Sequence, residues 1–170
     1  MRLPLMLGLG LLLLGWSGCA GYRLGPTNGL AAGAKSIQVN LFQNETLEPR
    51  LIEAVGIALR RNLQQDGTYR LNTHGDGDIV VQGVITGFYR SPLSFQPADI
   101  LTVRDYSVAM TVKVTATERS TGAILLDQEV SGRTTVRAGA DLASAERQAV
   151  PLLAEDLAKN VTALLVDGKW

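Results

Sequence analysis

The sequence predicts an α+β fold, a two-layer sandwich in which a mostly antiparallel sheet of about four strands is covered by two helices. Two observations predict it. Several segments alternate strictly between apolar and polar residues, which indicates strands with one covered and one wet face. Two other segments carry apolar residues at helical spacing. Because the apolar face of the sheet needs a cover, we expect these two amphipathic helices to provide it.

The first eighteen residues differ in composition from the rest. Met1-Arg2 supplies a short cationic start, and residues 3–14 are nearly all Leu, Met and Gly. This run is shorter than the ~20 residues of a membrane-spanning helix and has the length of a signal-peptide core. Small residues then precede Cys19, the one cysteine in the chain. We therefore predict a lipoprotein signal peptide over residues 1–18, with the Cys19 thiol receiving diacylglycerol.

Two features bear on this anchor. Trp16 stands where such signals usually have Leu, so an ordinary secretory signal with an unrelated cysteine, or a misplaced start codon, is the alternative. Acyl chains on Cys19 would hold the protein on a membrane without a transmembrane helix. Ala20 follows the cysteine, and the sorting pattern of Gram-negative lipoproteins then favours the outer membrane, on its periplasmic side. Residues 19–34 are rich in Gly, Ala, Pro and Asn and predict a tether before a single domain over residues 35–170.

The first strand and helix of this domain follow each other closely. Ile37, Val39 and Leu41 alternate with polar residues and predict a strand with one apolar face. Residues 46–49 then open a helix, because proline is tolerated in a first helical turn. Asp66-Gly67 ends it, since glycine takes the left-handed cap conformation readily. The residues expected on the buried side are Leu51, Ile52, Val55, Leu59 and Leu63; Arg60, Arg61 and Gln64 are expected outside.

The middle of the chain predicts strands joined by turns. Residues 68–72 predict a short strand, 75–78 a turn and 79–90 a longer strand. Residues 91–100 contain Pro92 and Pro97 and predict a loop, although Leu93 and Phe95 are apolar where polar residues are commoner. Residues 106–117 alternate most regularly, and the turn at 120–122 leads into a return strand that carries Ile124, Leu126, Val130 and Val136 on one face. The two strands therefore predict a hairpin.

The last segment has a helical period. The apolar stripe consists of Leu142, Ala145, Ala149, Leu153, Leu157, Val161 and Leu164. Asp141 is expected as its N-cap. Pro151 falls inside the stripe, so we expect either a kink there or a helix that begins near it.

The sequence offers little chemistry for catalysis. The chain has one histidine, His74, in a predicted turn beside Asp76 and Asp78. The spacing of these acids does not continue into a calcium loop, since Gly87 stands where the last ligand would be. We predict no catalytic residue, no metal site and no cofactor beyond the covalent lipid. Lys plus Arg equals Asp plus Glu, at 16 each, which argues against nucleic-acid binding.

Basic residues stand out at the ends of neighbouring predicted strands. Arg104, Arg133 and Arg137, with Arg90 nearby, could form a cationic patch that holds phosphate groups. The alternative is a solvated sheet face in which these arginines pair with Asp105, Asp127 and Glu129.

The chain resembles the LPS-assembly lipoprotein family, LptE. The resemblance rests on four motifs in order: residues 19–24 (CAGYRL), 37–46 (IQVNLFQNET), 59–67 with its LRRNL and DG, and the hairpin 106–112 with the turn 120–122. Asn40 stands where many relatives have Pro. The resemblance implies two helices against a four-stranded sheet and no enzymatic activity. It also implies a plug in the lumen of the outer-membrane β-barrel LptD, which helps the barrel fold and assists delivery of lipopolysaccharide to the outer leaflet.

Two alternatives stay open at this point. The chain could be another outer-membrane lipoprotein that acts as a structural or secretion-system component. It could also be a periplasmic enzyme, which would require a cleft that joins His74 to acidic residues. Arg104, Arg133 and Arg137 are candidate lipopolysaccharide contacts from their local chemistry and not from the resemblance.

Overall fold

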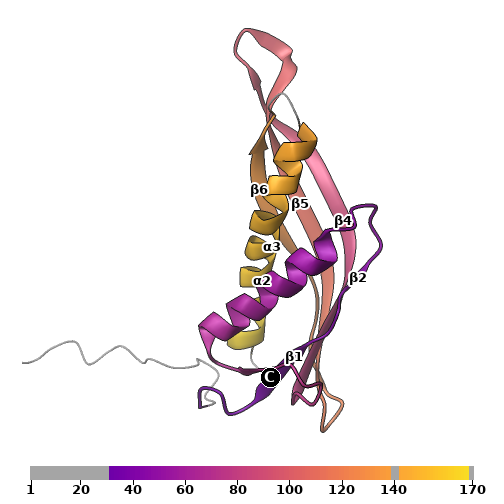
Figure 1. The fold of residues 1–170 in the computed structure, drawn as a ribbon, viewed down its shortest axis with the longest axis vertical. Coiled ribbons are helices and arrows are strands. Elements are labelled where there is room, and N and C mark those ends of the chain that lie inside the picture. The colour runs from indigo at the N-terminus through magenta and orange to yellow at the C-terminus, as the bar shows by residue number, and fades with distance from the viewer. Residues whose placement is uncertain (1–30, 139–141, 169–170) are drawn as a thin grey trace, which may run out of the picture.

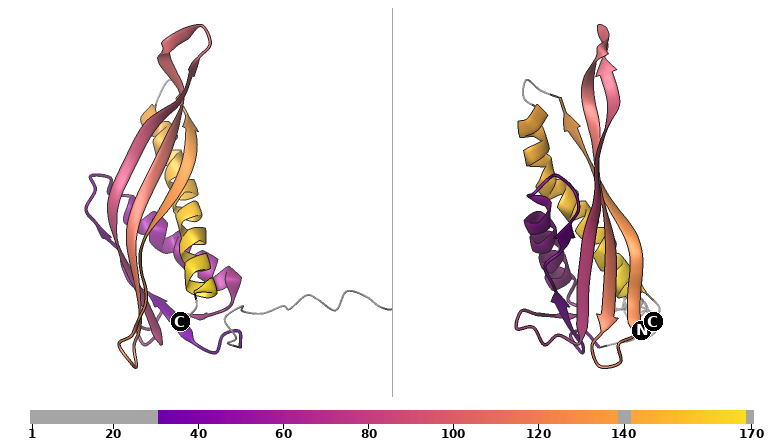
Figure 2. Two further views of the ribbon diagram at one scale, coloured as in Figure 1. Left: turned by 180° about the vertical axis from the view of Figure 1, so that it is seen from behind. Right: turned by 90° about the vertical axis from the view of Figure 1, so that its right-hand side faces the viewer.

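A computed structural model describes residues 31–138 and 142–168. Across these residues the chain forms an α+β fold with a sheet of six strands and two helices. The predicted signal peptide, the predicted lipidation site Cys19, most of the predicted tether and the predicted N-cap Asp141 lie outside the described residues. Figure 1 shows the two helices packed on one face of a long, twisted sheet, and Figure 2 shows the other face bare. The predicted two-layer arrangement is thus confirmed.

The sheet is mixed and larger than the predicted four strands. Its elements are β1 (Ser36–Val39), β2 (Gln43–Asn44), β3 (Arg70–Asn72), β4 (Ile79–Gln96), β5 (Asp99–Glu118) and β6 (Ile124–Arg137). The order is β3-β1-β4-β5-β6, and β2 also pairs with β4. The pairs of β1 with β3, of β1 with β4 and of β2 with β4 are parallel. For the pair of β1 with β3 this direction follows from the helix between them, because a crossover brings the chain back to the same end of the sheet.

Helix α2 (Leu51–Asp66) ends as predicted. Gly67 has φ +74°, and its N–H donates to the Leu63 carbonyl. Arg60 departs from the prediction: it is half-buried and donates to the carbonyl of Val39 at 2.8 Å.

The strand before α2 ends earlier than the alternation suggested. Leu41 is 78% exposed, whereas Phe42 is buried. The chain leaves β1 after Val39, and this reverses the alternation. The Phe42 ring packs against Gly83 so closely that a Cβ on this glycine would lie 2.5 Å from a ring carbon. The glycine in β4 therefore makes room for this ring.

Helix α3 (Leu142–Asp167) is one continuous helix that passes through Pro151. Its buried side is wider than the predicted stripe, because α3 packs against both the sheet and α2 (Figure 2). At Gly132 of β6, a Cβ would stand 2.6 Å from the Leu153 carbonyl oxygen, so helix and strand meet backbone to backbone there. Asp156 and Asn160 of α3 also bond the backbone of Arg133 and Ser131, which covers the middle of this edge strand.

The predicted loop over residues 91–100 is wrong. β4 continues to Gln96 and β5 starts at Asp99, so these residues form the end of a long hairpin. Pro92 is accommodated opposite Tyr106, and the register shifts immediately after it. On its other side β4 pairs with β1 and β2, and these described pairings involve only residues 79–85. Pro92 therefore lies on an open edge, where a proline costs no ladder hydrogen bond.

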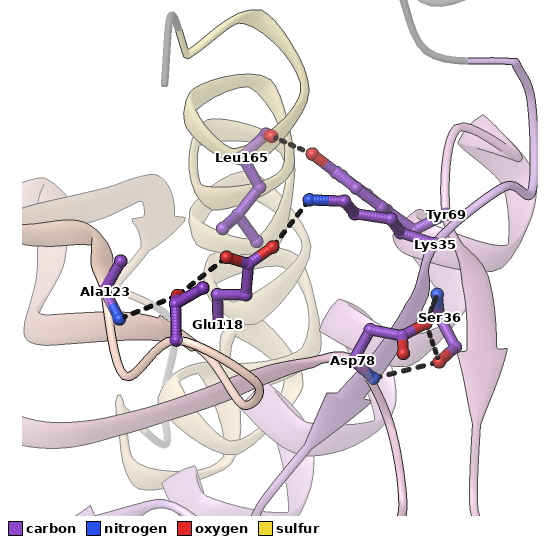
Figure 3. Close-up of polar contacts among 8 residues, drawn as sticks. Lys35, Ser36, Tyr69, Asp78, Glu118, Ala123 and Leu165 are labelled. Atoms are coloured by element: carbon purple, nitrogen blue, oxygen red, sulfur yellow. Dashed lines mark hydrogen bonds and ion pairs between the residues drawn. The ribbon is translucent and has the colours of Figure 1, made fainter.

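Polar contacts close the end of the sheet that lies opposite the turn between β4 and β5 (Figure 3). We call this end the base and define it by Lys35, Ser36, Tyr69, Asp78, Glu118 and Leu165. Lys35 pairs with Glu118 at 2.7 Å, and the Ser36 hydroxyl donates to the Asp78 carboxylate at 2.7 Å. The buried Tyr69 donates to the Leu165 carbonyl at 3.0 Å and so joins β3 to the end of α3. No helix in the described ranges is long and apolar enough to cross a membrane.

Candidate functional site

The far end of the β4–β5 hairpin projects beyond both helices (Figures 1 and 2). We call residues 91–103 the tip. β5 has 20 residues and α3 has 26. At about 3.3 Å per strand residue and 1.5 Å per helix residue, the strand is longer than the helix by roughly 25 Å. The tip is therefore left without a covering layer.

The tip carries large apolar side chains in solvent. Leu93 is 59% exposed, Phe95 48%, Ile100 77% and Leu101 88%. All four lie within a few residues of the turn between β4 and β5. A concentration of apolar side chains on a projecting element is typical of a binding surface.

A cluster of polar side chains lies at the root of the tip. The Asp105 carboxylate accepts hydrogen bonds from the Ser94 hydroxyl at 2.5 Å and from Arg104 Nε at 2.8 Å, and Arg137 Nε lies 3.4 Å from its other oxygen. Ser94 pairs with Asp105 across β4 and β5, and Asp105 pairs with Arg137 across β5 and β6. Three neighbouring strands thus converge on one carboxylate, and we call Ser94, Arg104, Asp105 and Arg137 the Asp105 cluster.

The charges of this cluster do not balance. The hydrogen bond from Ser94 and the two arginines hold the pKa of Asp105 down at about 2, so the carboxylate stays ionised at neutral pH. Two guanidinium groups face one carboxylate, which leaves one positive charge in excess. The Asp105 side chain is 15% exposed, whereas those of Arg104 and Arg137 are 48% and 76% exposed. Solvent, or an anionic ligand, can therefore reach the cations more easily than the carboxylate.

The predicted patch of arginines is only partly assembled. Arg104 and Arg137 meet at Asp105, as the alternative of paired charges predicted. Arg133 lies on the same face of β6 as Arg137 but four residues away, or roughly 13 Å along the strand. Arg90 points to the helix side, where it pairs with Glu146 and stacks over the Tyr106 ring at 5.6 Å. Arg90 therefore serves the packing of α3 on the sheet.

The bare face of the sheet is polar along its length. Along the middle of the sheet it presents odd-numbered residues of β5 and β6. The even-numbered residues of β5 from Val108 to Ala116 are buried under the helices, as are Leu126, Val130, Gly132 and Val136 of β6. Thr111, Thr115 and Thr117 lie on this face, and Lys113 lies 3.6 Å from Asp127 across the strands. Tyr89 covers Gly87, where a Cβ would stand 2.3 Å from the ring. We call this surface the exposed sheet face.

The turn around His74 has a structural explanation. The Asn72 side chain accepts from the backbone N–H of His74 at 2.8 Å and donates to Asp76 at 2.8 Å. Asp78 belongs to the base through Ser36, and those bonds lower its carboxyl pKa. Arg119 holds the same turn by donating to the carbonyls of Gly75 and Gly77. The described residues contain no group of three His, Cys, Asp or Glu side chains that could hold a metal ion.

Sequence reasoning found part of this end of the molecule. It noted Leu93 and Phe95 and weighed Asp105 as a partner of the arginines. The sequence predicts no role for Ile100, which falls in the segment 91–100 expected to be a loop, none for Leu101, and no bond from Ser94 to Asp105. The unusual apolar content of a segment with two prolines was the signal that could have found them.

Comparisons with known proteins agree with the fold. A family model described as LptE, lipopolysaccharide-assembly, matches residues 34–165. No curated protein matches the sequence.

Solved structures match at low identity. A hypothetical protein from Chlamydia trachomatis has a TM-score of 0.57 at 12% identity, over 79% of this chain and 98% of that one. A protein from Xanthomonas campestris has a TM-score of 0.53 at 10% identity, over 85% and 91%. A candidate lipoprotein from Caulobacter crescentus has a TM-score of 0.51 at 10% identity, over 74% and 88%. At these identities the likeness establishes the fold alone.

Proposed function

Because the chain belongs to the LptE lipopolysaccharide-assembly family, we propose that it is an outer-membrane lipoprotein that plugs the LptD β-barrel, helps that barrel assemble and assists delivery of lipopolysaccharide to the outer leaflet. The match of the family model over residues 34–165 carries this proposal. The family is one of non-enzymatic lipoproteins that partner with LptD and need no cofactor.

The exposed sheet face supports the plug. The lumen of an outer-membrane barrel is polar, and its wall presents hydroxyl, amide and charged groups. A face lined by threonines and by the Lys113–Asp127 pair can exchange its water for hydrogen bonds to such a wall. An apolar face would gain nothing from that environment. The proposed contact is therefore between the exposed sheet face and the barrel wall.

The lipid on Cys19 is proposed as the anchor. Residues 19–30 precede the described chain, and an extended segment of that length reaches up to about 40 Å. The described chain begins near the base, at the end opposite the tip (Figures 1 and 2). With the base tethered to the periplasmic leaflet, the tip is free to extend away from the anchor and into the barrel.

Arg104 and Arg137 are proposed to contact the phosphates of lipopolysaccharide, with Arg133 on the same face of the sheet. Guanidinium groups bind phosphate through paired N–H donors. Both clustered arginines use Nε for Asp105, so their outer N–H groups remain available to a second anion. No bond of the lipid is made or broken. The site would weaken the packing of lipopolysaccharide aggregates by competing for their phosphates.

Co-purification tests this function. The full chain, expressed with its own signal and labelled with palmitate, is isolated from solubilised outer membranes, and the bound species are identified by mass. We expect label on the mature protein, a large β-barrel in about equal amount, and lipopolysaccharide. A chain with Cys19→Ser should lose the label. Recovery of a secretion component instead of a barrel would overturn the proposal and favour the alternative lipoprotein role.

A further inference from the structure

The apolar tip does not fit the environment that suits the rest of the bare surface. The exposed sheet face is polar and matches a polar lumen, whereas Leu93, Phe95, Ile100 and Leu101 are 48–88% exposed at the end of the same hairpin. Apolar side chains placed against a wet polar wall gain no burial. The molecule that covers these four side chains must therefore be apolar itself.

The surroundings of the tip narrow the choice of occupant. Its root is the Asp105 cluster, in which two half-exposed or exposed guanidinium groups share one carboxylate. Asp105 lies four residues from Leu101 on β5, or roughly 13 Å along an extended strand. An apolar surface with a cationic root complements a molecule that has hydrocarbon at one end and negative charge at the other. A phosphorylated lipid has both.

We propose that the tip is a binding surface for the acyl chains of a phosphorylated lipid, which lie against Leu93, Phe95, Ile100 and Leu101 while Arg104 and Arg137 contact its phosphate. This inference rests on the proposed function and deepens it, because it assigns the hydrocarbon part of the ligand to a place on the chain. The two halves of the site act together: charge brings the lipid to the root, and burial of apolar area holds it on the tip.

Loss of affinity on removing apolar groups tests the proposal. Leu93→Ser combined with Leu101→Ser should lower the affinity for diphosphoryl lipid A by on the order of tenfold or more, because both substitutions remove apolar area that the acyl chains would cover. The matched control is Leu152→Ser on α3, because Leu152 is 61% exposed and Leu93 is 59% exposed. The control should bind lipid A as the unsubstituted chain does.

A fluorescence measurement reports the contact itself. Phe95→Trp places a probe on the tip and Leu152→Trp places one on the helix layer, and the unsubstituted chain supplies the background spectrum. Addition of diphosphoryl lipid A should shift the emission of the tip probe to shorter wavelength and leave the α3 probe unchanged. Inorganic phosphate, which carries no hydrocarbon, should shift neither.

The outcomes separate this inference from the function on which it rests. If the leucine variant retains full lipid A affinity, or the tip probe does not shift, the inference is wrong even when the barrel still co-purifies. If the variant loses the barrel and keeps lipid A affinity, the tip is a protein contact and the inference is again wrong. Failure of the unsubstituted chain to recover any barrel would instead count against the proposed function.

Discussion

The base and the tip are two ends of one sheet, and they satisfy their side chains in opposite ways. At the base, Tyr69, Ser36 and Lys35 all find partners within the chain, and the aromatic ring is buried. At the tip, leucines and a phenylalanine stand in solvent, and two arginines share a single carboxylate. The base is built for stability, whereas the tip leaves both its apolar area and part of its charge to another molecule.

Removing an aromatic ring should give the largest difference in stability between the two ends. Tyr69→Ala should lower the free energy of unfolding by about 3–5 kcal/mol, because it empties a buried aromatic site and leaves the Leu165 carbonyl without its donor. Phe95→Ala is the matched change at the tip and should cost less than about 0.5 kcal/mol. Urea unfolding measures both. Comparable losses at the two positions would contradict the distinction.

A smaller change isolates the hydrogen bond at the base. Tyr69→Phe keeps the ring and removes only the hydroxyl that donates to Leu165 at 3.0 Å. We expect the free energy of unfolding to fall by about 1 kcal/mol, so that the urea midpoint falls while the slope of the free energy against urea concentration stays the same. An unaltered midpoint would mean that this bond does not help fasten β3 to α3.

At the root of the tip, the same logic predicts a gain in binding. Asp105→Asn removes the carboxylate that now neutralises one guanidinium, so affinity for diphosphoryl lipid A should rise on the order of three- to tenfold at low salt. Asp127→Asn is the control, since Asp127 pairs with Lys113 on the same face. Equilibrium binding at two salt concentrations measures the effect. Weaker binding by Asp105→Asn would mean that the carboxylate mainly positions the arginines.

Acid should erase the stability that this carboxylate contributes. The pKa of Asp105 is lowered from 3.8 to about 2 by Ser94, Arg104 and Arg137. A carboxyl with a lowered folded-state pKa stabilises the fold fully above its unfolded value and loses that contribution as the pH falls through the folded value. The difference in unfolding free energy between the unsubstituted chain and Asp105→Asn should therefore be constant above about pH 5 and shrink toward pH 2. A constant difference down to pH 2 would contradict the pairing.

Much of the base could be predicted from the sequence, because local rules apply there. The end of α2 at Gly67 and the hairpin of β5 and β6 follow from a glycine cap and from period-two alternation. The parallel pairs of β1 were missed, since alternation shows that a segment is a strand but not which neighbour it joins. The end of the first strand shows the same limit, because the chain leaves β1 after Val39 and buries Phe42 in place of Leu41.

The tip could not be predicted in this way. Pro92 and Pro97 are typical of loops, and only the open edge of β4 and the turn position make them compatible with the hairpin. The Asp105 cluster depends on the register of three strands, which places Ser94 and Arg137 on either side of one carboxylate. Sequence spacing carries no such register. It therefore groups Arg104, Arg133 and Arg137, whereas the structure brings only Arg104 and Arg137 to one carboxylate.

Site-specific photo-crosslinking in cells tests the central claim, which is that the exposed sheet face contacts the barrel while the tip contacts lipid. A photoreactive residue is placed at Thr115 on the exposed sheet face, at Phe95 on the tip and at Leu152 on α3 as a control. We predict a barrel-sized adduct from Thr115, a lipopolysaccharide adduct from Phe95, and neither of these in comparable yield from Leu152. A barrel adduct from Phe95 with no lipid adduct, or no barrel adduct from Thr115, would contradict the account.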